Sequence, residues 1–201
     1  MPNVKHFPSI LALLLVACGR SSSAPAPASA LTPAPAPASA LAPAPASALA
    51  PASALDDDLV GKPAPDFSAT AQDGTPVHLA ALKGKPVVVY FYPKDETPGC
   101  TKEACSFRDS WQDIAKTGAV LVGISADAAD SHRAFAAHYK LPFLLLSDPD
   151  GKIGNAYGVP FAVYHQRQTF VIGPDGNVLK VYRKVDVTVH AAQVLGDLNR
   201  T

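Results

Sequence analysis

Two cysteines five positions apart, Cys100 and Cys105, are the residues of this chain whose types and spacing could do chemistry. They follow an apolar run at 87–92 that is typical of a buried strand, and they lie where a helical pattern begins. Cys100 is therefore expected in the first helical turn, where free backbone N–H groups and the helix dipole favour a thiolate over a thiol. A thiolate with a second thiol nearby is typical of a thiol-based redox enzyme.

Two nearby cysteines could also bind a metal ion. A structural zinc site needs four ligands, and this Cys-x4-Cys spacing has no adjacent histidine, while His165 and His190 are distant in the sequence. We therefore expect no metal and no other cofactor. Three further histidines are expected on the surface or in a hairpin: His78, His132 and His138.

The elements that must hold the cysteines follow from the apolar patterns of residues 59–201. A short hairpin is expected first, with strands at 67–70 and 77–79. Further strands are expected at 87–92, 119–125, 143–146, 169–172 and 178–182, and helices at 98–116, 128–140, 152–157 and 188–199. Strands that alternate with helices and end in a hairpin and a helix predict an α/β sandwich.

The segment around Cys100 resembles the peroxiredoxins. Their signature of Pro, three residues, Thr, two residues and Cys is present as Pro93, Thr97 and Cys100. The longer string Tyr-Phe-Tyr-Pro-Lys-Asp-x-Thr-Pro-Gly-Cys-Thr-x-Glu-Ala-Cys-x-Phe-Arg-Asp is similar to the peroxiredoxin Q branch, also called bacterioferritin comigratory protein. The likeness extends from about Gly61 to the C-terminus. It implies a thioredoxin-like α/β sandwich with a central mixed sheet and an N-terminal hairpin extension.

The resemblance also implies a thiol-dependent peroxidase that reduces hydrogen peroxide and organic hydroperoxides, with a thioredoxin-like or other dithiol as reductant. Cys100 would be the peroxidatic nucleophile that becomes a sulfenic acid, and Cys105 the resolving cysteine. Thr97 would place its hydroxyl on the peroxide and Pro93 would shield the pocket from water. Arg167 matches the family's Arg-x-Thr-Phe-x-Ile segment and would complete the site.

Each of these residues has a plainer interpretation. Cys100 or Cys105 could be a buried structural thiol, Thr97 could be a helix N-cap or turn hydroxyl, and Arg167 could belong to a surface ion pair. The chain as a whole could instead be a thioredoxin-like thiol–disulfide oxidoreductase of the cell envelope, although that class favours Cys-x-x-Cys. A non-enzymatic lipoprotein scaffold is the third interpretation.

Arg108 lies on the same expected helix as both cysteines. It is a weaker candidate for the site, and a solvated arginine that pairs with Asp109 or Asp113 is the preferred interpretation.

The spacing of the cysteines carries a mechanical consequence. Positions i and i+5 of an ideal helix differ by about 140° in azimuth and roughly 7.5 Å in rise, so their Cα atoms lie about 8–9 Å apart. A disulfide requires less than about 7 Å between Cα atoms. If Cys105 resolves a Cys100 sulfenic acid, the first turns of the helix must therefore unwind.

The N-terminal residues 1–17 have the pattern of a bacterial lipoprotein signal peptide. A short polar start precedes an apolar stretch that is too short to span a bilayer, and it ends in Leu-Val-Ala-Cys-Gly at 15–19. This string matches the lipobox, so we expect cleavage before Cys18 and lipidation of Cys18, which gives a membrane anchor. An ordinary secretory signal peptide and a cytosolic protein with an apolar start are the alternatives.

Residues 18–58 contain Cys18 and an Ala/Pro-rich tether. The unit Pro-Ala-Pro-Ala-Ser-Ala-Leu occurs at 25–31, 35–41 and 43–49, and its prolines disfavour helix. In the polyproline II conformation the tether would reach on the order of 100 Å. It could lift the enzyme off a membrane or be a neutral repeat expansion. We expect localisation in the cell envelope, facing the periplasm, and in the outer membrane where two membranes are present.

The chain has 201 residues and a formal net charge of zero. There is consequently no electrostatic basis for nucleic-acid binding. The 59–201 segment is long enough for one hydrophobic core and is expected to be the peroxiredoxin domain, acting as a monomer.

Overall fold

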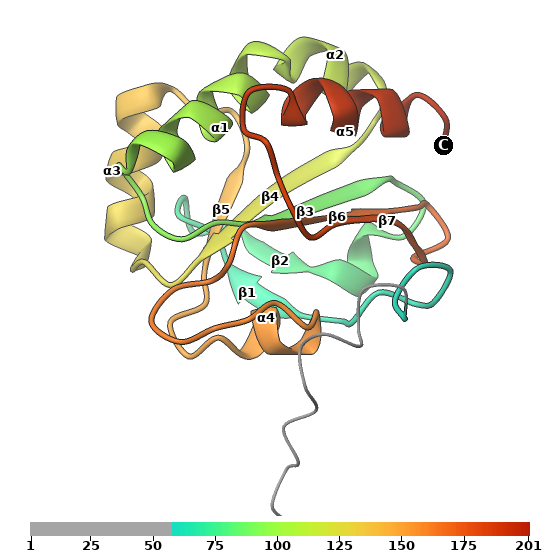
Figure 1. Cartoon of the computed structure of the whole chain (residues 1–201), viewed down its shortest axis with the longest axis horizontal. Helices are drawn as coiled ribbons and strands as arrows, with labels where there is room; N and C mark the ends of the chain where they lie inside the picture. The colour runs from blue at the N-terminus through green and yellow to red at the C-terminus, as the bar shows by residue number, and fades with distance from the viewer. Residues whose placement is uncertain (1–57) are drawn as a thin grey trace, which may run out of the picture. The chain divides into compact units, whose positions relative to one another are not determined.

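The central sheet of the computed structural model, which describes residues 58–201, has five strands (Figure 1). Their order is β5 (Leu144–Ser147), β4 (Val120–Ser125), β3 (Val87–Phe91), β6 (Gln168–Ile172) and β7 (Val178–Tyr182). β3, β4 and β5 are parallel, whereas β6 and β7 run antiparallel to their neighbours. A separate hairpin pairs β1 (Ser68–Thr70) with β2 (Pro76–His78). The predicted α/β class, with its mixed sheet and N-terminal hairpin, is confirmed.

Five α-helices and a 3-10 helix, η1 (Leu79–Leu82), complete the described part of the chain. The α-helices are α1 (Pro98–Asp109), α2 (Trp111–Lys116), α3 (Ala129–Tyr139), α4 (Lys152–Ala156) and α5 (His190–Leu198). The predicted single helix at 98–116 is wrong, because Ser110 leaves helical geometry with φ −91° and ψ 2° and separates α1 from α2. η1 was not predicted, because its Leu-Ala-Ala-Leu sequence is too short to show a period.

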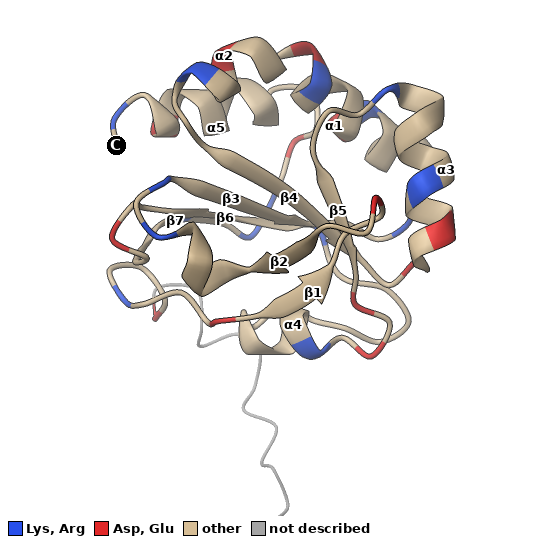
Figure 2. Ribbon diagram, turned by 180° about the vertical axis from the view of Figure 1, so that it is seen from behind, with Lys and Arg blue, Asp and Glu red and all other residues tan. Residues whose placement is uncertain are grey.

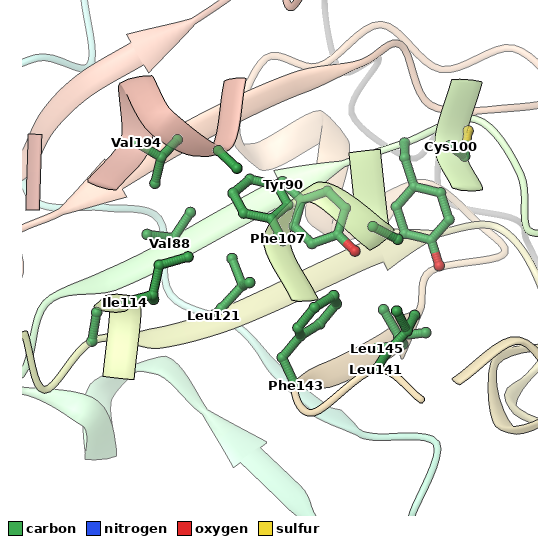
Figure 3. Packing of buried hydrophobic residues seen from close by; sticks show 14 of the residues in the cluster. Val88, Tyr90, Cys100, Phe107, Ile114, Leu121, Leu141, Phe143, Leu145 and Val194 are labelled. Carbon is green, nitrogen blue, oxygen red and sulfur yellow. The ribbon is translucent and has the colours of Figure 1, made fainter. Parts of the chain in front are cut away.

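The side chains of β3 divide the core into two layers. All five residues of β3 are buried, and successive side chains point to opposite faces of the sheet. Val88 and Tyr90 pack with Cys100 and Phe107 under α1, α2, α3 and α5 (Figure 3). Val87, Val89 and Phe91 belong to the second layer, on the side of the β1–β2 hairpin and α4 (Figure 1). A strand buried on both faces fixes the position of the loop that follows it.

The loop between β3 and α1 emerges at the carboxyl end of a parallel strand. That edge of an α/β sheet is the usual position of a functional site. Because β6 runs antiparallel to β3, with Gln168 opposite Phe91, the residue that precedes β6 lies at this same edge.

In the view of Figure 2, the charged residues of the described elements are mixed in sign and spread over helices and loops. No helix within residues 58–201 is long and apolar enough to span a bilayer. The predicted signal peptide, lipidated Cys18 and tether fall on residues outside the described part of the chain, apart from Asp58 at the end of the tether.

Candidate active site

Cys100 is the third residue of α1 and is buried, with 2% of its surface exposed. The helix begins there because Thr97 is extended at the N-cap position, with ψ 146°, and Pro98 occupies the first helical position. Proline is well suited to that position, since its fixed φ matches the helix and it lacks an N–H group that would be unpaired. The Cys100 sulfur thus lies at the positive end of the α1 dipole, as the sequence predicts.

Arg167 directly precedes β6 and meets Cys100 at the sheet edge where β3 ends. Its Nη2 group donates a hydrogen bond to the Cys100 sulfur at 3.0 Å, and its Nη1 group forms an ion pair with Glu103. Burial by itself would lower the pKa of Arg167, but the negative charges of Glu103 and Cys100 outweigh it and raise the pKa. The guanidinium therefore stays charged beside the sulfur, and Arg167 is not a surface ion pair.

Glu103 is a site residue that sequence reasoning missed. Its side chain is 1% exposed and one carboxylate oxygen, Oε1, has no hydrogen-bond partner among the described residues. Burial raises the pKa of Glu103 to about 7, although Arg167 opposes this shift. A carboxylate three residues after Cys100, on the same face of a helix that must pack on a sheet, was the signal that could have identified it.

Thr97 and Pro93 lie in the loop before α1. The Thr97 hydroxyl donates a hydrogen bond to the Lys94 carbonyl at 3.0 Å, and it makes no capping bond to the helix. In this state the hydroxyl stabilises its own turn, which is the plainer of the two interpretations, and it stands one helical turn before Cys100. Pro93 is partly buried at the start of the same loop.

A buried polar cluster anchors this loop to α3. Asp95 accepts hydrogen bonds from Tyr92 at 2.8 Å and from Ser131 at 2.7 Å, and its carboxylate lies 2.9 Å from Nδ1 of His132. The other ring nitrogen of His132 faces the Leu146 carbonyl at 3.1 Å. Burial alone would raise the pKa of Asp95, but these hydrogen bonds, with His132 the largest, lower it.

His132 is therefore not a surface residue, and that prediction is wrong. The side chain is 0% exposed, because its position in α3 points it at the Asp95 loop. The helical period around Phe135 did not reveal this, since the partner is 37 positions away in the sequence.

Cys105 lies five residues beyond Cys100 on the same uninterrupted helix and is partly buried. Both cysteines are free thiols. Their placement on one regular helix supports the spacing argument, because a disulfide between them requires α1 to open. Arg108 forms the expected ion pair with Asp109 at 2.8 Å, and it also donates a hydrogen bond to the Tyr139 carbonyl at 2.9 Å.

No group of three or more metal-ligating side chains is present within residues 58–201. His165 instead lies 3.2 Å from Asp148, and His190 lies 2.8 Å from the Thr169 hydroxyl. A cavity of about 260 Å³ opens beside η1 and the turn before β7, and none of its lining residues belongs to the Cys100 site.

Comparison with known proteins gives consistent matches over the described region. The model of the AhpC/TSA family matches residues 60–181. A chloroplastic peroxiredoxin Q from Sedum lineare is 54% identical over 125 residues, which are 61% of this chain and 67% of that protein. A putative peroxiredoxin bcp from Coxiella burnetii is 46% identical over 147 residues, which are 69% of this chain and 97% of that protein.

Solved structures agree with these sequence matches. Peroxidoxin BcpB from Mycobacterium tuberculosis has a TM-score of 0.67 and 38% identity, over 70% of this chain and 96% of that one. Peroxiredoxin Q from Xanthomonas campestris has a TM-score of 0.64 and 36% identity, over 67% and 90% of the two chains. By contrast, the chain spans only 58% of the length of the peroxiredoxin Q from Oryza sativa.

The relatives contradict the predicted localisation in the cell envelope. The plant proteins that match at 52–54% identity are named as chloroplastic, and these names mention no membrane anchor. The prediction of a lipid-anchored envelope protein is therefore wrong. It depended on the first 58 residues alone, all of which precede the matched region.

Proposed function

The chain belongs to the AhpC/TSA family, in the peroxiredoxin Q and bacterioferritin comigratory protein branch, and we propose that it reduces hydroperoxides with Cys100 as the nucleophile. Members of this branch are thiol-dependent peroxidases, so the expected enzyme class and thioredoxin-like fold are confirmed. We further propose that residues 59–201 are the catalytic unit. The observation that carries the proposal is the 3.0 Å contact between Arg167 Nη2 and the Cys100 sulfur at the start of α1.

In the first step the Cys100 thiolate attacks the terminal oxygen of the hydroperoxide. The S–O bond forms as the O–O bond breaks, and the departing alkoxide takes a proton and leaves as an alcohol, or as water when the substrate is hydrogen peroxide. Cys100 is left as a sulfenic acid. Donors that point at the developing negative charge lower the barrier to such a step. Arg167 already donates to the Cys100 sulfur, and Thr97 precedes Cys100 by three positions at the N-cap of the same helix.

Glu103 assists this step by holding Arg167. With Nη1 engaged by the carboxylate, Nη2 is directed at the Cys100 sulfur. A planar guanidinium held at one edge has little rotational freedom, so its donors stay aligned as the peroxide reacts. Pro93 shields the pocket from water in this proposal, and its partial burial beside the site supports that role.

In the second step Cys105 resolves the sulfenic acid. Its thiolate attacks the Cys100 sulfur, the S–S bond forms, and the S–O bond breaks to release hydroxide, which takes a proton and becomes water. The first turns of α1 open before the bond can close, because both cysteines lie on that helix. A thioredoxin-like or other dithiol then reduces the disulfide by thiol–disulfide exchange.

We propose that the protein acts as a monomer. Within the described residues only five large hydrophobic side chains are exposed, and they are scattered in the sequence: Val60, Val163, Tyr164, Leu179 and Val189. Obligate interfaces are larger and more apolar than that.

The proposal is tested by peroxide consumption with a dithiol donor. Cys100→Ser should abolish turnover. Arg167→Ala should slow sulfenic acid formation by about 10- to 100-fold, the value of a charge-assisted hydrogen bond, and Thr97→Val should slow it less. Arg133→Ala is the matched control. Arg133 lies on α3, and its guanidinium donates hydrogen bonds to the Gln72 carbonyl and to Asp130, not to Cys100. Turnover by the Cys100→Ser protein would refute the assignment.

A further inference from the structure

We propose that Arg108 assists the second step, by stabilising the thiolate of Cys105 as it attacks the oxidised Cys100. The inference deepens the proposed function and rests on the resolving role of Cys105. Without this role, the ion pair with Asp109 would be the whole function of the Arg108 side chain.

The two cysteines have different electrostatic surroundings. Cys100 lies in the first turn of α1, and Arg167 bonds its sulfur. Cys105 lies two turns into the helix, where the dipole no longer acts, since its effect falls off within the first turn. Only a thiolate attacks a sulfenic acid or a disulfide at a useful rate, so Cys105 needs another source of positive charge.

Arg108 is placed to supply that charge. It follows Cys105 by three positions in α1, and such pairs lie on one face with Cβ atoms about 5–6 Å apart. The Arg108 side chain is 33% exposed, and the hydrogen bond from its guanidinium to the Tyr139 carbonyl holds it against the end of α3. The pKa of Arg108 is raised, chiefly by its bond to Asp109 and further by Cys105, so the two side chains interact.

The other charged or titratable groups near Cys105 do not replace Arg108. Tyr139 also interacts with Cys105, but its hydroxyl donates to Glu96 at 3.0 Å, and this bond is the main cause of its raised pKa, so it stays neutral. Glu96 is further paired with His138 at 3.1 Å. Lys102 precedes Cys105 by three positions, but it is exposed and its charge acts on Asp186.

The position of Arg108 also suits the motion of α1. The segment that must unwind lies between the two cysteines, and Arg108 lies beyond it, in the last turn of the helix. Its bond to the Tyr139 carbonyl ties that last turn to α3. The positive charge therefore stays beside Cys105 while the preceding turns open.

The test separates the two chemical steps in the full chain by stopped-flow fluorescence of Trp111, the single tryptophan. After one equivalent of peroxide, Arg108→Gln should leave sulfenic acid formation unchanged. It should slow disulfide formation about tenfold at pH 7 and move the pH profile of that step to higher pH. Arg108→Lys should restore part of the loss. Lys102→Gln, the matched control at the same spacing, should change neither step.

Two results would overturn the inference. One is an Arg108→Gln protein whose disulfide formation keeps the wild-type rate and pH profile. The other is a slower step with an unshifted profile, which would show that Arg108 only anchors the helix. If mass spectrometry finds no Cys100–Cys105 disulfide in the oxidised wild-type protein, the resolving role of Cys105 fails first, and the inference fails with it.

Discussion

Replacement of Glu103 by glutamine should change how the stability of this protein depends on pH. Glu103 is buried beside Arg167, and its pKa is raised from an ordinary value of 4.5 to about 7, mainly by burial. Glutamine has nearly the same shape but carries no titratable proton. The difference between the two proteins therefore isolates the linkage between folding and the ionisation of this one carboxyl.

The sign of the effect follows from the two pKa values. Below pH 4.5 the carboxyl is protonated in both the folded and the unfolded states. Between pH 4.5 and 7 the unfolded chain releases the proton while the folded protein retains it, so the free energy of unfolding falls as the pH rises. Above pH 7 both states are ionised and the effect is constant. At about 1.4 kcal/mol for each unit of pKa, the total is about 3 kcal/mol.

The assay is urea unfolding of the reduced protein at half-unit steps from pH 4 to pH 8. Wild type should lose about 3 kcal/mol more than Glu103→Gln across that range. Glu96→Gln is the matched control, because Glu96 is the other glutamate of the chain and its side chain is 48% exposed. Parallel curves for wild type and Glu103→Gln would refute the reasoning, since they would mean that burial does not hold the proton on Glu103.

Three further predictions concern the helix, the core and the loop. Oxidised protein should lose amide protection across residues 98–105 relative to reduced protein, as measured by hydrogen exchange, while the sheet stays protected; equal protection in a protein with the confirmed disulfide would contradict the opening of α1. Gly123→Ala should lower stability by about 1–3 kcal/mol in urea unfolding. Its new Cβ would lie 2.6 Å from the buried ring of Tyr90, so an unchanged midpoint would contradict the packing. Asp95→Asn should cost about 1–3 kcal/mol, because it removes the buried carboxylate that accepts from Tyr92 and Ser131 and contacts His132. The same substitution should slow sulfenic acid formation, measured by stopped flow. A wild-type free energy of unfolding together with a wild-type rate would show that the loop does not need this anchor.

Some features of the site were available from local sequence. The apolar run before Cys100, with Pro98 at the first helical position, places the cysteine at a helix start whatever the rest of the chain does. The period-2 and period-3.6 patterns are local too, so the strands and most helices were predicted to within a few residues. The i, i+5 relation between Cys100 and Cys105 is likewise a property of one helix.

Other features depended on contacts between distant segments. His132 was assigned to the surface because its partner Asp95 belongs to another element. Ser110 ends α1 although the helical pattern continues across it, and neither residue type nor spacing marks the break. The segment before residue 59 led to a localisation that the relatives contradict, and that segment precedes the region that matches them.

The sequence by itself determined the fold class and the position of Cys100 at the start of a helix that also carries Cys105, because each follows from patterns encoded within a few neighbouring residues. Only the tertiary structure decided what surrounds Cys100. The antiparallel register of β6 on β3 brings Arg167 to Cys100 from 67 positions away, and the burial that results gives Glu103 its altered pKa. Charge and solvation at a site depend on everything within a few ångströms of it, and linear order does not specify that neighbourhood.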